Sequence, residues 1–191
     1  MTQRSLFDEK AETLRIYLQE TLQGNKSQLE HATKIFSETL SIGNTIFWCG
    51  NGGSASESSH LATELVGRFK ENRISLPSVS LNADTTAITC IANDFGYDEI
   101  YARQLQGLSK PGDLLLVLST SGKSQNILRA LEQAKISKVQ TIALLGKGGG
   151  PAMEMADIAI VVPGFETARI QEVHLLIGHT LCELAETFLG F

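Results

Sequence analysis

Apolar and polar residues follow a helical pattern over the first forty residues of the chain. Between residues 7 and 40 apolar side chains recur every three or four positions, with an interruption at Gly24 and Asn25. This spacing predicts two helices before any strand. Their apolar surface is larger than one sheet face needs, which favours subunit packing, although packing within the chain is also open.

After residue 45, short continuous apolar runs alternate with helical stretches. Continuous apolar strands are typical of a parallel sheet that is buried on both faces. Five runs have this character: residues 45–49, 78–81, 114–119, 141–145 and 158–162. Helical windows lie between and after them at residues 54–69, 85–107, 124–136 and 166–188. The pattern predicts an α/β three-layer sandwich with a mostly parallel five-stranded sheet, preceded by the N-terminal helices.

Length and charge narrow the class of protein. A chain of 191 residues has the size of one domain. We expect a single domain over residues 1–191, with a helical packing or oligomerisation segment at 1–42 and an α/β core at 43–191. The net charge of −5 argues against direct nucleic-acid binding, which needs a concentrated basic surface.

The cysteines and apolar runs bear on where the protein works. Cys49, Cys90 and Cys182 are widely spaced and odd in number, which predicts reduced core thiols rather than a disulfide framework. The apolar runs are too short to span a bilayer, and the first ten residues lack an apolar signal core. We therefore expect a cytoplasmic protein without a membrane partner.

A glycine-rich segment, residues 50–54, follows the first predicted strand and opens the helix that carries His60. Its glycines permit positive φ angles and close backbone approach to a ligand, and Ser54 is placed to cap the helix. The segment also fits the dinucleotide pattern G-x-G-x-x-A, but the helix behind it is polar and no acidic residue is placed to hold a ribose. A phosphate site and a purely structural turn remain open.

A second segment, residues 119–124, reads Ser-Thr-Ser-Gly-Lys-Ser between a strand and a helix. Its four hydroxyl groups and its glycine form a neutral cradle suited to a phosphate dianion. Gly122, Lys123 and Ser124 look like the end of a P-loop, but Val117 stands where that motif requires glycine. A helix cap without a ligand is the structural alternative.

Candidate acid–base groups lie on two predicted helices. His60 and Glu64 are four residues apart and share a helical face, which suits a base with its partner, half of a metal site, or a solvated pair. The last helix is rich in polar residues: Arg169, Gln171, Glu172, His174 and His179. Glu172 and His179 share a face, whereas Gln171 and His179 are offset by roughly a quarter turn, so spacing does not choose among them.

Asn93 and Asp94 form a polar pair inside the otherwise apolar segment 91–97. They could line a sugar pocket or make an Asx turn.

Four stretches of the chain resemble the phosphoheptose isomerases of the SIS-domain family: CGNGGSASESSHLATEL (49–65), ANDFGYDEIYARQ (92–104), GDLLLVLSTSGKSQNI (112–127) and ARIQEVHLLIGH (168–179). The resemblance runs from about residue 46 to residue 184 and implies a SIS, flavodoxin-like fold.

The resemblance implies a set of sugar-phosphate ligands and a metal site. The positions that match the family's substrate-binding motifs are Asn51, Gly52, Gly53, Glu64, Asn93, Asp94, Ser119, Thr120, Ser121, Ser124 and Gln171. One zinc ion per subunit would be held by His60, Glu64, Gln171 and His179. Glu64 would be the catalytic base and His179 its acid–base counterpart.

The implied reaction converts D-sedoheptulose 7-phosphate to D-glycero-D-manno-heptose 7-phosphate through an enediol. It would be the first step toward ADP- or GDP-heptose precursors of lipopolysaccharide or surface glycans, performed by a homotetramer. DnaA-associated SIS proteins, which bind phosphosugars without catalysis, are the alternative, but they look degenerate at the positions of Glu64 and His179. Another SIS isomerase, acting on a pentose or hexose phosphate, is a further alternative. Ala168 departs from the aspartate that some phosphoheptose isomerases carry before the Arg-Ile-Gln motif.

Overall fold

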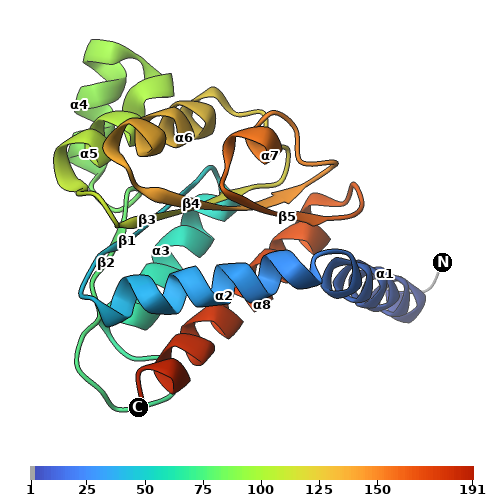
Figure 1. Cartoon of the computed structure of the whole chain (residues 1–191). Coiled ribbons are helices and arrows are strands. Elements are labelled where there is room, and N and C mark those ends of the chain that lie inside the picture. Colours follow the sequence, from blue (N-terminus) through green and yellow to red (C-terminus); the bar gives the residue numbers. More distant parts are fainter. Residues whose placement is uncertain (1–2) are drawn as a thin grey trace.

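Five parallel strands form one sheet in the order β2-β1-β3-β4-β5 (Figure 1). The computed structural model describes residues 3–191, and the side chains from Ser5 onward. The strands are β1 (Ile46–Gly50), β2 (Ser78–Ser80), β3 (Leu114–Ser119), β4 (Gln140–Gly146) and β5 (Ile158–Val162). Ile46 pairs with Ser78 on one side and with Leu114 on the other. The predicted five-stranded sheet is confirmed, with the strand order of flavodoxin-like folds.

Helices cover both faces of the sheet. α2 (Lys26–Ser41), α3 (Gly53–Val66) and α8 (Thr167–Phe188) lie on one face, and α5 (Ile100–Leu108), α6 (Gln125–Ser137) and α7 (Ala152–Met155) lie on the other (Figure 1). α4 (Thr85–Phe95) packs outside α5, joined to it by a 3₁₀ turn, η1 (Tyr97–Glu99). α1 (Gln3–Gly24) precedes α2 in the chain and extends beyond the sheet. The first two residues of the predicted N-terminal segment lie outside the described residues.

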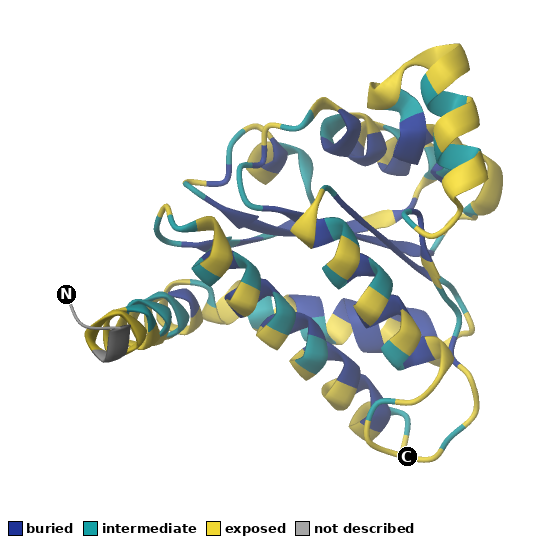
Figure 2. Ribbon diagram, turned by 180° about the vertical axis from the view of Figure 1, so that it is seen from behind, coloured by how far each residue is buried: buried dark blue, intermediate teal, exposed yellow. Residues whose placement is uncertain are grey.

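Alternate residues of the strands supply two cores. Trp48, Leu116 and Leu144 pack toward α2, α3 and α8, whereas Phe47, Leu115 and Ala143 pack toward α5 and α6. The edge strands β2 and β5 are partly exposed, whereas the central strands β1 and β3, and β4 from Thr141 on, are buried on both sides (Figure 2). This double burial explains why they read as continuous apolar runs.

Helix boundaries differ from the sequence prediction at three places. The window 85–107 is divided into α4 and α5 because Gly96, at φ +93°, ends the first helix. α3 ends at Val66 rather than at residue 69, with Gly67 as its C-cap. α7 has only four residues, too few to show a helical period, and was not predicted.

Two further features bear on the expectations from composition. All three cysteines are free, and Cys49 and Cys182 are buried, but Cys90 is exposed on α4, so it is not a core thiol. Across residues 3–191, no helix has both the length and the apolar character needed to cross a membrane.

Candidate active site

The first glycine-rich loop begins where β1 ends, and side chains from two other segments hold that end. The Gly50 amide donates to Asn82 Oδ1 (3.2 Å), and Asn82 Nδ2 donates to the Gly50 carbonyl (2.9 Å). The Tyr101 hydroxyl also donates to the Gly50 carbonyl. Burial raises the pKa of Tyr101, so this hydroxyl stays protonated at neutral pH. These hydrogen bonds therefore fix the backbone of Gly50, where the loop begins.

Asn51 links this loop to α6. Asn51 Nδ2 donates to Asn126 Oδ1 (2.9 Å), and Asn126 Nδ2 donates to Asn51 Oδ1 (2.8 Å). Tyr97 adds a hydroxyl bond to the same Asn51 oxygen (3.1 Å). The Asn51 side chain is thus engaged within the protein, which leaves the loop backbone to face a ligand. Sequence reasoning missed Asn82, Tyr97, Tyr101 and Asn126, because their contacts join segments distant in sequence.

The start of α3 packs against Gln171 of α8. Gly52, at φ +57°, is the N-cap of α3, so Ser54 lies inside the helix and does not cap it as predicted. Gln171 Nε2 donates to Ser54 Oγ (3.4 Å). A Cβ at residue 53 would overlap the Gln171 amide, so Gly53 is the residue type this contact allows.

The second loop, between β3 and α6, keeps several hydroxyls available. Ser119 Oγ accepts from the Gly122 amide (3.0 Å), which closes the turn. Ser124 is the N-cap of α6, but its hydroxyl makes no side-chain capping bond. The alternative of a helix cap without a ligand requires such a bond. Gly122 has φ +61°, and a Cβ there would collide with the Gly149 carbonyl. The second loop therefore packs closely against the backbone of the segment that follows β4.

The two loops face each other across a cavity of ≈ 210 Å³ at the carboxyl end of the sheet. Its lining is made of hydroxyls, amides and backbone, from Asn51, Gly53, Ser54, Leu118, Ser119, Thr120, Ser121, Ser124, Thr167 and Gln171. The N-termini of α3 and α6 both begin here. Helix N-termini and hydroxyl donors bind anions such as phosphate without a nearby cation.

Three of the candidate catalytic side chains converge farther along α3 and α8. His60 Nε2 lies 3.1 Å from Glu64 Oε1 and 3.0 Å from His179 Nε2. His179 Nε2 lies 3.8 Å from Glu64 Oε1, and the three ligand atoms lie within 4.8 Å of one another. Glu64 is the least exposed member. The structure thus joins His60, Glu64 and His179 into one cluster.

The chemistry of this cluster suits a cation. Burial, assisted by the neighbouring His60 and opposed by Glu64, lowers the pKa of His179 below its usual value. A neutral imidazole can offer its free nitrogen to a metal. Two imidazoles with one carboxylate form a donor set that zinc uses in catalytic sites. The residues present therefore fit a divalent metal.

Glu57 adds a half-buried carboxyl to the same helix, between the loop and the cluster. Burial raises the pKa of Glu57 to about 7, and its Oε2 is enclosed without a hydrogen-bond partner. At neutral pH this carboxyl is divided between its protonated and ionised forms.

Other predicted site residues lie apart from the cluster. Gln171 of α8 points to Ser54 at the start of α3, whereas His179, also of α8, belongs to the cluster. Asn93 and Asp94 are exposed in the last turn of α4, where Asn93 Nδ2 donates to Asp94 Oδ1 (2.8 Å). They do not line the cavity between the loops. Among the described residues, the pair makes no hydrogen bond to another candidate ligand.

The remaining polar residues of α8 have separate partners. Arg169 Nη2 donates to Glu172 Oε1 (2.5 Å) at the first turn. His174 is fully buried, and its Nε2 donates to the Leu145 carbonyl (3.0 Å). Burial lowers the pKa of His174 to about 4, so it is neutral at physiological pH.

A larger hollow of ≈ 540 Å³ lies at the opposite edge of the sheet, near the amino ends of β4 and β5. Its lining mixes opposite charges, including Lys135, Lys138 and Asp157. Asp157 is already occupied by the amide and hydroxyl of Thr141. Ligands of parallel α/β sheets bind at the carboxyl edge, so the smaller cavity between the loops is the better candidate.

Comparisons with known proteins show which family the chain resembles. The SIS domain family model matches residues 11–146. The chain is 52% identical over 155 residues to the phosphoheptose isomerase of Nitratiruptor sp., and the aligned region covers 81% of this chain and 83% of that protein. It is 49% identical over 158 residues to that of Akkermansia muciniphila, covering 83% and 84%. A solved structure of a phosphoheptose isomerase from Francisella tularensis aligns with a TM-score of 0.92 at 34% identity, covering 98% of this chain and 100% of that one.

Proposed function

Because the chain belongs to the SIS-domain family and, within it, to the phosphoheptose isomerases, we propose that it converts D-sedoheptulose 7-phosphate to D-glycero-D-manno-heptose 7-phosphate. The observation that carries the proposal is the arrangement along α3. A phosphate-type cavity lies at the start of this helix, and an acid–base cluster lies near its end. A non-catalytic phosphosugar-binding regulator would need only the first of these.

The cavity between the loops would hold the phosphate of the substrate. Asn51, Gly52, Gly53 and the hydroxyls of Ser119, Thr120, Ser121 and Ser124 would provide backbone and side-chain donors, supported by two helix N-termini. His60 lies seven residues beyond Gly53, which corresponds to about 10 Å along the helix. An extended seven-carbon chain places its first carbon at a comparable distance from a phosphate on its last carbon, which favours a heptose over a shorter sugar.

The cluster would then perform the isomerisation. Starting from the ketose, Glu64 would take a proton from C1, so that an enediol forms between C1 and C2, and would then return the proton to C2. His179 would move the accompanying proton between the two oxygens. The carboxylate of Glu64 is only partly exposed, which limits exchange of the transferred proton with water.

We include one zinc ion per subunit in the proposal, held by His60, Glu64 and His179, with Gln171 as the predicted fourth ligand. Bound there, zinc would supply Lewis-acid polarisation of the sugar oxygens. The convergence of the three donor atoms supports this assignment. Gln171 faces Ser54 and precedes His179 by eight residues, about 12 Å along α8, so a rotation of its amide alone does not bring it to the cluster.

The proposal is tested by incubating the purified, metal-replete protein with sedoheptulose 7-phosphate and following formation of the aldoheptose 7-phosphate. Glu64→Gln, which keeps the side-chain shape but removes the base, should lower kcat by about 10²- to 10⁴-fold. Binding of the sugar phosphate should survive, because the cavity between the loops is unchanged. Binding without turnover by the wild-type protein would instead support the regulator, and turnover of a pentose or hexose phosphate alone would support another SIS isomerase.

The assembly and setting of the enzyme belong to the same proposal. We infer a homotetramer, supported by exposed apolar side chains along α1, among them Leu6, Phe7 and Leu22. Asn93 and Asp94, exposed on α4, would then contact substrate at a subunit boundary. The three free cysteines support a reducing, cytoplasmic setting, where the product would enter heptose precursor synthesis for lipopolysaccharide or surface glycans.

A further inference from the structure

A buried ion pair lies directly behind the His60–Glu64–His179 cluster. Arg73 Nε donates to Glu186 Oε1 (2.9 Å), and the two side chains are 0% and 3% exposed. Arg73 lies in the loop after α3, and Glu186 lies on α8 seven residues beyond His179, on the same helical face. The pair therefore joins the two helices that carry the cluster.

Glu186 fixes the course of the loop that contains Arg73. Its carboxylate accepts backbone N–H bonds from Phe69 (3.2 Å), Lys70 (3.1 Å) and Glu71 (3.3 Å). Burial opposes the ionisation of Glu186, but these amides and Arg73 outweigh it and hold the pKa of Glu186 below its usual value. Three consecutive amides are thereby bound to one carboxylate on α8.

Arg73 fixes the end of α3 in the same way. Its Nη2 donates to the Glu64 carbonyl (2.7 Å), and its Nη1 donates to the carbonyls of Leu65 (2.7 Å) and Ile74 (2.9 Å). The last carbonyls of a helix lack partners within the helix, so a side-chain donor here sets where the helix ends. One of these carbonyls belongs to Glu64 itself.

The loop also touches His179 directly. The Phe69 ring stacks on the His179 imidazole, with ring centroids 5.3 Å apart and an angle of 13° between the planes. Glu186 holds the Phe69 amide, so the orientation of this ring depends on the ion pair. The pair thus reaches two members of the cluster, Glu64 through its backbone and His179 through Phe69.

Resting on the proposed function, we propose that Arg73 and Glu186 are positioning residues that set the distance between Glu64 and His179. Desolvation makes a buried ion pair an inefficient source of stability compared with apolar side chains of similar size. A network that satisfies both partners does fix a unique geometry. A displacement of about 1 Å between catalytic groups can cost about 10²-fold in rate.

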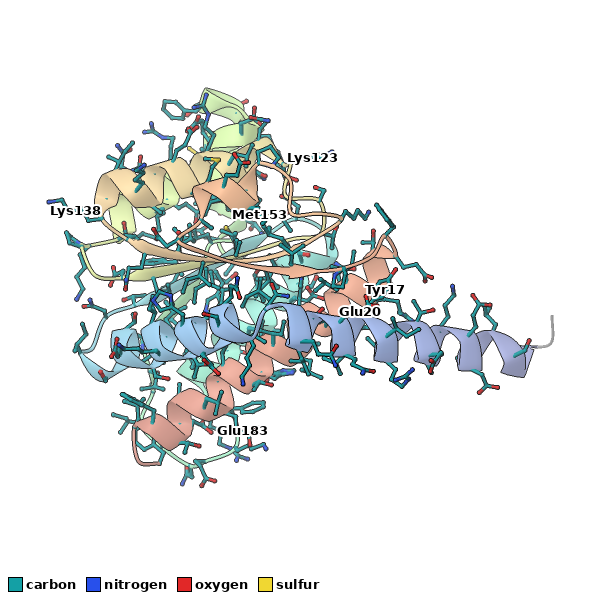
Figure 3. The ribbon with its side chains drawn as sticks, turned by 45° about the vertical axis from the view of Figure 1, so that its right-hand side comes forward. Tyr17, Glu20, Lys123, Lys138, Met153 and Glu183 are labelled. Atoms are coloured by element: carbon teal, nitrogen blue, oxygen red, sulfur yellow. The ribbon has the colours of Figure 1, made fainter. Side chains whose placement is uncertain are left out.

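The test compares Glu186→Gln with Glu183→Gln. Glu183 is a matched control, because it binds Lys70 of the same loop from the same helix (2.6 Å) but is exposed to solvent (Figure 3). For each folded variant, kcat and KM for sedoheptulose 7-phosphate are measured with saturating zinc. Zinc affinity is measured separately by competition with a chromophoric chelator, and folding by circular dichroism. Arg73→Lys, which keeps the charge but loses the bonds to the α3 carbonyls, is the second variant.

We expect Glu186→Gln to lower kcat at least tenfold and to weaken zinc binding about 10- to 100-fold, while KM changes less than threefold because the phosphate cavity is distant. Glu183→Gln should match wild type. The proposal is overturned if Glu186→Gln equals Glu183→Gln in both kcat and zinc affinity, or if neither Glu186→Gln nor Arg73→Lys folds, since the pair would then be structural. Failure of wild type to isomerise the sugar would count against the proposed function, whereas the zinc measurement tests the pair independently.

Discussion

A histidine in the last helix shows how burial changes the role of a residue type. His174 lies within the motif that resembles the family, yet its Nε2 donates to the Leu145 carbonyl of β4 and its side chain is fully buried. Its Nδ1 has no hydrogen-bond partner. His179, five residues later, is partly exposed and belongs to the cluster. Five residues correspond to about 140° around a helix, so the two imidazoles lie on different faces of α8, and only that of His179 is available to the cluster.

Burial of His174 should make stability depend on pH. An unfolded histidine binds a proton below pH 6.5, whereas burial lowers the pKa of His174 in the fold to about 4. Between these values the unfolded chain binds more protons, so the free energy of unfolding should fall as pH falls, by up to about 1.4 kcal/mol per pH unit. His174→Gln, which keeps a donor for Leu145 but does not titrate, should flatten this dependence.

The measurement is urea unfolding at pH 7.5, 6.5 and 5.5 and at fixed protein concentration, followed by the fluorescence of the buried Trp48. Other titrating groups contribute equally to both proteins and cancel in the difference. Equal pH slopes for wild type and His174→Gln would contradict the prediction.

At the scale of elements, the two loops are coupled through a pair of amides. Asn51 belongs to the β1–α3 loop, and Asn126 lies in the first turn of α6, which follows the second loop. Their reciprocal bonds set how far apart the two helix N-termini stand. The width of the cavity between the loops therefore depends on a contact behind it.

Asn126→Ala should weaken binding of the sugar phosphate more than it slows the reaction. Removal of Asn126 leaves Asn51 Nδ2 without its acceptor, at a cost of about 1–3 kcal/mol, whereas Asn51 Oδ1 keeps the Tyr97 hydroxyl. We expect KM for sedoheptulose 7-phosphate to rise about tenfold and kcat to change less than threefold. Gln125→Ala, an exposed neighbour on α6, is the control and should keep the wild-type KM. A KM for Asn126→Ala equal to that of the control would remove the coupling argument.

The sequence predicted the elements better than the contacts between them. Double burial makes the central strands apolar almost throughout, and the five predicted runs lie within a residue or two of the observed strands. The loops at 50–54 and 119–124 stood out because glycine and hydroxyl residues follow apolar strands. By contrast, Arg73 and Glu186 are 113 residues apart, and nothing in the local sequence around either distinguishes a buried, paired charge from a solvated one.

At the scale of the whole molecule, one side carries apolar surface that the fold does not cover. An almost wholly apolar groove of ≈ 200 Å³ runs between α1, α2 and α8, and Leu22, Leu176 and Leu184 in its lining are 46%, 43% and 40% exposed. α1 extends past the sheet on this side, so its apolar positions have few partners within the chain (Figures 1 and 3). Contiguous apolar surface of this kind is typical of subunit interfaces.

Leu22→Glu should therefore disrupt the proposed homotetramer. A carboxylate placed in an apolar interface loses its hydration without gaining a partner, and Glu30 in the same groove adds repulsion. Size-exclusion chromatography with light scattering should give four subunits for wild type and a smaller species for Leu22→Glu. Ile136→Glu is the matched control, since Ile136 is 74% exposed on α6, on the other side of the sheet, and should leave the mass unchanged. A tetrameric Leu22→Glu would exclude this groove from the interface, and a monomeric wild type would refute the tetramer. If the smaller species also loses turnover while it retains zinc, the active site requires a neighbouring subunit. The exposed positions of Asn93 and Asp94 predict this result.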